Sequence, residues 1–205
     1  MTPESEMDPA AMRRLVGIAL RAGVGMVHYC HRDLSRREMA GQATAVVRMT
    51  RVSQTALIIR HAIDVALAIG ADGVHLDAED LPVASARRLM GPAAIIGATA
   101  LTPEDARLAE EDGATYVSVG WTGAPPAQQG ASISLDGLDR IRAATALPIC
   151  VCGDAATDRL EELVAHGAQL IAVGAAIHGQ AIPAAAAREI IRRAAAIRYP
   201  HHTAP

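Results

Sequence analysis

The chain has 205 residues, which is enough for one domain with a hydrophobic core, and no low-complexity stretch divides it. Its formal net charge is −3 and only 2% of its residues are aromatic, which disfavours nucleic-acid binding. No apolar run approaches the roughly 18 residues that a membrane span needs, and the first residues do not resemble a signal peptide. We therefore expect a cytoplasmic protein with neither a nucleic-acid nor a membrane partner.

The N-terminal segment, residues 1–8, is polar and acidic and predicts a disordered lead. A helix is expected from Pro9 to Ala22, because apolar residues recur at helical spacing and Asp8 can cap its first turn. We expect a single barrel domain over residues 9–198 and a frayed tail over residues 199–205.

Strands and further helices then alternate, joined by short loops. The expected strands are Val24–Tyr29, Ala56–Arg60, Val74–Leu76, Ala94–Ala98, Tyr116–Gly120, Pro148–Cys152 and Leu170–Gly174. The expected helices are Ser35–Met49, Ile63–Ile69, Leu81–Met90, Thr102–Asp112, Leu135–Ala146, Thr157–His166 and Ile182–Ile197. This alternation predicts an α/β fold, a TIM-type (β/α) barrel whose chemistry lies at the C-terminal ends of the strands.

A cluster of acids follows one of these strands directly. The stretch IGADGVHLDAEDLP places Asp77, Glu79 and Asp80 after a short apolar strand, where carboxylates can hold a cation. The alternative is an acidic loop in which Asp80 caps the next helix, and the residues alone leave both open. Within the strand, His75 is expected to be a hydrogen-bonded interior histidine rather than a ligand.

Histidines and cysteines form further candidate sites. Three histidines stand near neighbouring strand ends and could join Asp80 in a metal or acid–base site: His28, His31 and His61. Cys150 and Cys152 are expected to be buried in a reducing compartment and to point to opposite faces of their strand. The long irregular segment from Trp121 to Ser134 is typical of a functional lid.

The order of these motifs resembles the thiamine-phosphate synthase family, which includes the related thiazole tautomerases. The resemblance covers about residues 13–177 and is closest in DVALAIGADGVHLDAEDLPVASARRLMGPAAIIGAT, with further similarity in GLDRIRAATALPICVCGDA and HGAQLIAVGAAI. It implies an enzyme of thiamine biosynthesis that joins hydroxymethylpyrimidine diphosphate to a thiazole phosphate and releases pyrophosphate. Its partners would be small phosphorylated heterocyclic substrates, and its cofactor would be Mg²⁺.

The resemblance also implies roles for individual residues. It assigns substrate and phosphate contacts to His28, Arg32, Arg60, Gln128, Gly153, Gly174 and Ala175. It assigns catalytic roles to Arg32 and Thr99, and a metal ion to Asp80 and His61. A mixed carboxylate–imidazole pair would also suit Zn²⁺ or Mn²⁺.

Several positions differ from the family pattern. Gln128 stands where the family has a phosphate-binding Lys, Asp154 where it has a second Gly, and Leu101 where many members have a His. The alternatives to a synthase are a non-catalytic homologue that binds a phosphorylated ligand or a partner protein, and a tautomerase-like isomerase.

The opening strand of the family has no counterpart in MTPESEMD. We therefore expect either a barrel that lacks or alters its first strand, or a gene start that lies upstream. A missing strand would leave two unpaired edges, which proteins usually cover with another segment or a partner chain, so a homo-oligomer is one expected form.

Overall fold

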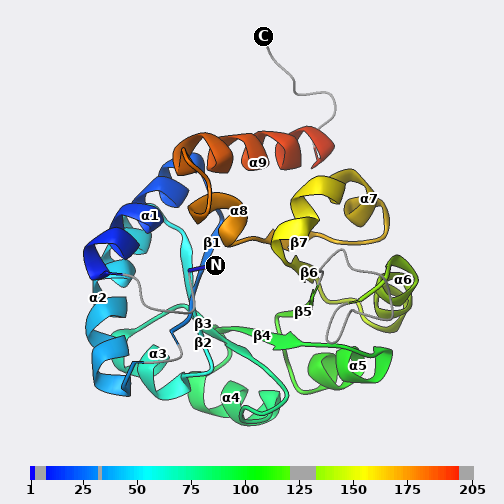
Figure 1. The fold of residues 1–205 in the computed structure, drawn as a ribbon. Coiled ribbons are helices and arrows are strands. Elements are labelled where there is room, and N and C mark those ends of the chain that lie inside the picture. Colours follow the sequence, from blue (N-terminus) through cyan, green and yellow to red (C-terminus); the bar gives the residue numbers. More distant parts are fainter. Residues whose placement is uncertain (3–7, 32–33, 121–132, 199–205) are drawn as a thin grey trace.

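The computed structural model describes residues 1–2, 8–31, 34–120 and 133–198, and these form one curled parallel sheet wrapped by helices (Figure 1). The sheet has the order β1-β2-β3-β4-β5-β6-β7, and every pairing is parallel. Its strands are β1 (Met26–Tyr29), β2 (Ala56–Arg60), β3 (Gly73–Leu76), β4 (Ile95–Thr99), β5 (Tyr116–Gly120), β6 (Ile149–Cys152) and β7 (Leu170–Ala172). The predicted TIM-type fold is confirmed.

The helices lie outside the sheet. They are α1 (Pro9–Ala22), α2 (Arg36–Val52), α3 (Ile63–Ile69), α4 (Val83–Met90), α5 (Pro103–Glu111), α6 (Leu135–Ala144), α7 (Leu160–Ala165), α8 (Ala175–His178) and α9 (Pro183–Arg198). A 3₁₀ helix, η2 (Asp154–Arg159), precedes α7 and occupies part of the single helix predicted over residues 157–166.

Local signals in the sequence set several helix ends. At the start of α1, the Asp8 carboxylate accepts a hydrogen bond from the Ala11 N–H at 3.0 Å, as predicted. Capping boxes begin two more helices, α2 at Ser35 and α5 at Thr102. The C-terminal end of α1 is Gly23, whose φ of 91° is in the left-handed region that glycine adopts without steric cost.

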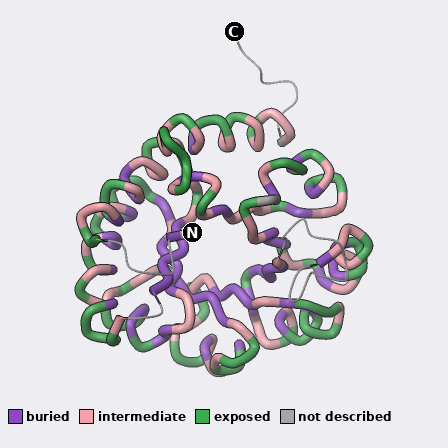
Figure 2. The backbone as a smooth tube through the Cα atoms, in the orientation of Figure 1, coloured by how far each residue is buried: buried purple, intermediate pink, exposed green. Residues whose placement is uncertain are grey.

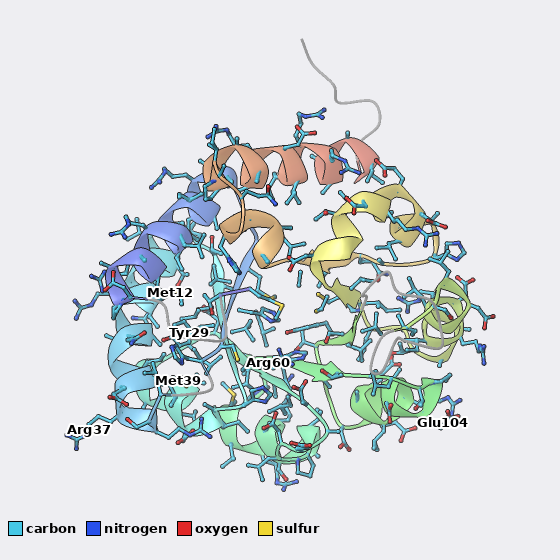
Figure 3. The ribbon with its side chains drawn as sticks, viewed as in Figure 1. Met12, Tyr29, Arg37, Met39, Arg60 and Glu104 are labelled. Carbon is cyan, nitrogen blue, oxygen red and sulfur yellow. The ribbon has the colours of Figure 1, made fainter. Side chains whose placement is uncertain are left out.

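The main hydrophobic core lies between the sheet and the helices, and the strands are its most buried part (Figure 2). Met12, Tyr29 and Met39 pack in this layer, whereas Arg60 points toward the interior of the barrel (Figure 3). Successive strand residues point to opposite faces, so the face of β1 opposite Tyr29 carries His28. The barrel interior is therefore polar where the outer layer is aliphatic.

The sheet is not closed into a full barrel. Its two end strands, β1 and β7, are not paired with each other, and the first two residues of the chain lie between them (Figure 1). The Thr2 N–H donates to the His28 carbonyl at 2.9 Å, and the Met1 amine donates to the Val173 carbonyl. The seven paired strands of the described residues agree with the expected barrel that lacks or alters its first strand.

Parts of two expected segments lie outside the described residues, namely residues 3–7 of the predicted lead and the whole tail, 199–205. In the described part of the chain, no helix combines the length and apolar character of a membrane-spanning segment.

Candidate active site

A cavity of about 740 Å³ opens at the C-terminal ends of β1 to β6. Five of the residues to which the resemblance assigns roles line it, namely His28, Arg60, His61, Asp80 and Thr99, and so does the candidate His31. Arg32 and Gln128 lie outside the described residues, as does most of the expected lid. The cavity confirms that side chains distant in sequence converge at the strand ends, as a parallel barrel requires.

A chain of hydrogen bonds crosses the cavity from Arg60 to His75. The Arg60 guanidinium donates to Asp77 Oδ2 at 2.8 Å, and the Thr99 hydroxyl donates to Asp77 Oδ1. The same Thr99 oxygen lies 3.1 Å from His75 Nε2. Burial would raise the pKa of Asp77, but the hydrogen bonds from Thr99 and Arg60 outweigh it and lower that pKa. Asp77 is therefore an ionised acceptor at the centre of the site.

Asp77 was predicted only as part of an acidic cluster that could hold a cation, and not as a partner of Arg60. Its position in the acidic cluster after β3 pointed to the site, but its pairing with Arg60 depends on the neighbouring strand β2.

His75, at the end of this series of hydrogen bonds, belongs to a buried group that also contains Tyr116 and His28. The Tyr116 hydroxyl lies 3.0 Å from His75 Nδ1 and 3.1 Å from His28 Nε2. Burial lowers the pKa of His75 to about 4 and that of His28 well below its ordinary value. Both imidazoles are thus neutral near pH 7. His75 is a hydrogen-bonded interior histidine, as predicted.

Asp80 and His61, the two residues predicted to hold a metal ion, lie next to each other. His61 Nδ1 lies 2.8 Å from Asp80 Oδ2, and that oxygen also accepts the Asp77 N–H at 2.8 Å. Helix α4 has no side-chain cap, so the alternative role of Asp80 as its cap is wrong. His61 has a φ of 64°, a strained conformation for a residue with a side chain.

At phosphate sites Mg²⁺ is usually held by one or two carboxylates, several waters and the phosphates of the substrate, so such a site needs few protein ligands. Within residues 1–2, 8–31, 34–120 and 133–198, no group of three or more His, Cys, Asp or Glu side chains is arranged to hold a metal ion.

Two backbone N–H groups near the start of α8 donate hydrogen bonds to a carboxylate of the chain itself, that of Asp154. Asp154 Oδ1 accepts hydrogen bonds of 2.8 Å from the N–H groups of Gly174 and Ala176. Burial would raise the pKa of Asp154, but these backbone hydrogen bonds lower it. The preceding Gly153 has a φ of 143°, which favours glycine. The predicted phosphate position at Gly174 and Ala175 is thus next to a carboxylate of the chain itself.

The expectation that Cys150 and Cys152 point to opposite faces of their strand was wrong. Cys150 Sγ and Cys152 Sγ lie 3.8 Å apart, so both side chains are on one face of β6. Residues two apart in a strand share a face, which the prediction overlooked.

Acidic side chains outnumber the arginines among the residues that line the cavity. Two are arginines, Arg36 and Arg60, and three are acids, Asp77, Glu79 and Asp80. The described lining therefore offers no excess positive charge to a diphosphate.

The curled parallel sheet with polar groups gathered at its strand ends defines a (β/α)-barrel protein of the kind that holds small molecules at that mouth. Comparison with known proteins makes the class specific. The family described as thiamine monophosphate synthase matches residues 2–177. The chain belongs to this family.

Two curated relatives illustrate the similarity. The chain is 38% identical to the thiamine-phosphate synthase of Moorella thermoacetica, with 88% of each protein covered. It is 37% identical to that of Roseiflexus castenholzii, over 86% of this chain and 78% of the relative.

Solved structures agree with the fold. Thiamine phosphate pyrophosphorylase from Pyrococcus furiosus superposes with a TM-score of 0.77 at 29% identity, covering 88% of this chain and 89% of that one. A 3-hexulose-6-phosphate synthase from Salmonella typhimurium has a TM-score of 0.75 at 19% identity, over 98% of both chains, and shows the shared fold alone.

Proposed function

We propose that this protein acts in thiamine biosynthesis as a thiamine-phosphate synthase, joining hydroxymethylpyrimidine diphosphate to thiazole phosphate. The observation that carries the proposal is the array of Arg60, Asp77 and Thr99 at the mouth of a barrel in this family. The array places a cation, an ionised acceptor and a hydroxyl within one cavity.

In the proposed reaction the carbon–oxygen bond between the pyrimidine methylene and the diphosphate breaks, and its electron pair leaves with pyrophosphate. The thiazole nitrogen then attacks the methylene carbon and forms the new carbon–nitrogen bond. Arg60, together with Arg32, would stabilise negative charge on the leaving group. The Thr99 hydroxyl would give up its hydrogen bond to Asp77 and donate to the substrate instead. His28 would contact the pyrimidine.

Mg²⁺ was expected from the resemblance, with Asp80 and His61 as its ligands. Asp80 would hold the ion together with waters and the phosphates of the substrate, and no step of the proposed reaction is assigned to the metal.

A second candidate function is a non-catalytic homologue that binds a ligand. Two observations favour it: Asp154 hydrogen-bonds the amides predicted to receive a phosphate, and Arg60 is paired with Asp77. Such a protein would keep the barrel and the cavity without turnover.

One experiment separates the two candidates. The purified protein is incubated with hydroxymethylpyrimidine diphosphate, thiazole phosphate and Mg²⁺, and mass spectrometry follows thiamine phosphate while a coupled assay follows pyrophosphate. Stoichiometric appearance of both products supports the synthase. No product, with calorimetric binding of either substrate, supports the binding homologue. Neither product nor binding would overturn both.

A further inference from the structure

Cys150 and Cys152 hold two thiols close together on one face of β6. Their sulfur atoms are 3.8 Å apart, and the two residues do not form a disulfide. Each residue of a strand advances the chain by about 3.3 Å, so Cα atoms two positions apart are separated by about 6.6 Å. The two side chains therefore lean toward each other.

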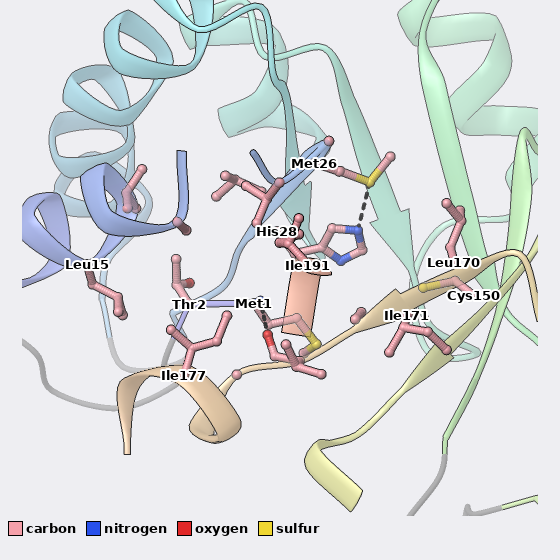
Figure 4. A pocket seen from close by; sticks show the side chains of 18 residues that line it. Met1, Thr2, Leu15, Met26, His28, Cys150, Leu170, Ile171, Ile177 and Ile191 are labelled. Atoms are coloured by element: carbon pink, nitrogen blue, oxygen red, sulfur yellow. Dashed lines mark hydrogen bonds between the residues drawn. The ribbon is translucent and has the colours of Figure 1, made fainter. Parts of the chain in front are cut away.

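The two thiols border different spaces in the molecule. Cys152 lines the polar cavity at the strand ends. Cys150 lines a second hollow of about 220 Å³, which Met26 and His28 also border (Figure 4). A small ion in the polar cavity therefore meets the pair at Cys152.

The neighbouring strands leave room beside Cys152. In the register of the sheet, this residue is paired with Gly120 on β5 and with Ala172 on β7. Residues paired in adjacent strands point to the same face, so the groups next to the thiol on these two strands are a hydrogen atom and a methyl group.

The spacing of the sulfurs suits an ion better than a disulfide. A disulfide needs an S–S distance of about 2.05 Å and Cβ atoms about 3.8 Å apart, which is closer than two positions of a regular strand allow. Strand β6 is paired on both sides, so bending it would disturb its pairing with β5 and β7. Two thiolates that bind one ion at about 2.3 Å are about 3.8 Å apart at a tetrahedral angle and about 4.6 Å apart in a linear arrangement.

The number of ligands selects the kind of ion. Thiolates prefer soft ions, of which Cu(I) and Zn²⁺ are the usual examples. A structural Zn²⁺ site takes four protein ligands, whereas two thiolates are enough for Cu(I). Among the side chains that the structure describes, His, Cys, Asp and Glu form no group of three or more arranged for a metal ion, so the pair has the composition of a Cu(I) site.

We propose that Cys150 and Cys152 together bind one soft monovalent cation, Cu(I), as a two-thiolate site. Each thiol gives up its proton to water and donates an electron pair to the ion, whose oxidation state does not change. The bound ion lies at the wall of the polar cavity, beside Cys152. This inference is independent of the proposed catalytic activity.

The test uses the full chain, reduced and without metal, under anaerobic conditions. Cu(I) is added in competition with a coloured Cu(I) chelator, and the colour reports how much of the ion the protein retains. We expect the unchanged chain to retain one Cu(I). Loss of a residue that only supports a ligand costs about 10–100-fold in metal affinity, so Cys150→Ser and Cys152→Ser should each cost roughly a hundredfold or more. Cys30→Ser is the matched control, because it removes the third cysteine of the chain, and it should retain the ion.

X-ray absorption at the copper edge of the unchanged chain gives a measurement that does not depend on the folding of any variant. Two sulfur neighbours support the proposal, and fewer than two would overturn it. Retention of Cu(I) by the double variant Cys150→Ser/Cys152→Ser would assign the ion to other groups and also overturn it. If the unchanged chain retains no Cu(I), while oxidised glutathione converts the two thiols to a disulfide, the pair is a redox couple and the proposal is wrong.

Discussion

The carboxylate of Asp154 accepts a hydrogen bond of 2.8 Å from the backbone N–H of Gly174. This contact brings the end of β6 and the start of α8 together and places negative charge where the resemblance predicts a phosphate. The first prediction concerns its removal. Asp154→Gly should free the amides and raise the affinity for inorganic phosphate by roughly tenfold or more, because charge-assisted hydrogen bonds to them become available.

Isothermal titration with inorganic phosphate measures this change. Asp154→Asn is the matched control, since it removes the charge but keeps an acceptor of the same size, and it should gain less. If Asp154→Gly binds phosphate no better than the unchanged chain, the amides do not form an anion site.

The second prediction concerns the ion pair in the cavity. Arg60 and Asp77 are 18% and 25% exposed, so Arg60→Ala would leave a partly buried carboxylate without its guanidinium partner. We expect the free energy of unfolding to fall by about 1–3 kcal/mol in urea denaturation. Arg107→Ala breaks an exposed pair with Glu104 and should cost less than about 1 kcal/mol. Equal losses of unfolding free energy in the two variants would show that the pair of Arg60 and Asp77 contributes no more than an exposed ion pair.

The third prediction is a pH dependence from His75. Its folded pKa of about 4 lies below its ordinary value of 6.5, so between these values the unfolded chain binds a proton that the folded chain does not. Stability should therefore rise with pH across this window, by at most roughly 3 kcal/mol from this group, and be fully present above the ordinary value.

Urea midpoints at pH 5 and 7.5 measure the effect. His75→Gln should reduce the difference between them, whereas His166→Gln, on the outer surface beside Asp139, serves as the control. An unchanged pH dependence in His75→Gln would show that other groups cause it.

The fourth prediction concerns the packing around His75. A Cβ added at Gly97 would lie 2.1 Å from the Tyr116 ring and 2.5 Å from His75 Nδ1, which is closer than real contacts allow. Gly97→Ala should destabilise the protein by about 1–3 kcal/mol. Gly41→Ala lies within α2 with nothing near the added atom, and should stabilise by about 0.5–1 kcal/mol. Thermal unfolding that ranks these two variants in the opposite order would be inconsistent with this packing.

The fifth prediction tests Thr99 under the proposed function. Thr99→Val keeps the shape of the side chain but removes the hydroxyl that donates to Asp77. Synthase turnover should fall by roughly tenfold or more, since one directed hydrogen bond is lost, while Thr99→Ser should retain most of it. Equal turnover in the Val and Ser variants would exclude a catalytic role for the hydroxyl.

The sequence predicted the alternation of elements because its local signals agree with the fold. The helix that begins at Pro9 ends at Ala22 as predicted, and the strands Ala56–Arg60 and Tyr116–Gly120 have the predicted bounds. The carboxylates after β3 and the polar residues at other strand ends also converge, because parallel strands place these ends together.

Pairings inside the site could not be predicted in the same way. The partner of Arg60 depends on which rotamer reaches Asp77 across two strands, and the contact from Asp154 to Gly174 joins residues 20 positions apart. Neither leaves a periodic signal in the chain. The helix predicted from Thr157 begins earlier as a 3₁₀ turn at Asp154, whose carboxylate bonds forward to α8 rather than capping its own helix.

The placement of Met1 has a practical consequence for anyone who purifies this protein. An affinity tag fused directly ahead of Met1 would remove the free amine that donates to Val173 and would place its last linker residues next to that contact. Such a tag would affect the protein itself, because the composition of its linker would change the protein's melting temperature and solubility. Tags at the opposite end of the chain are the appropriate choice for every comparison between variants.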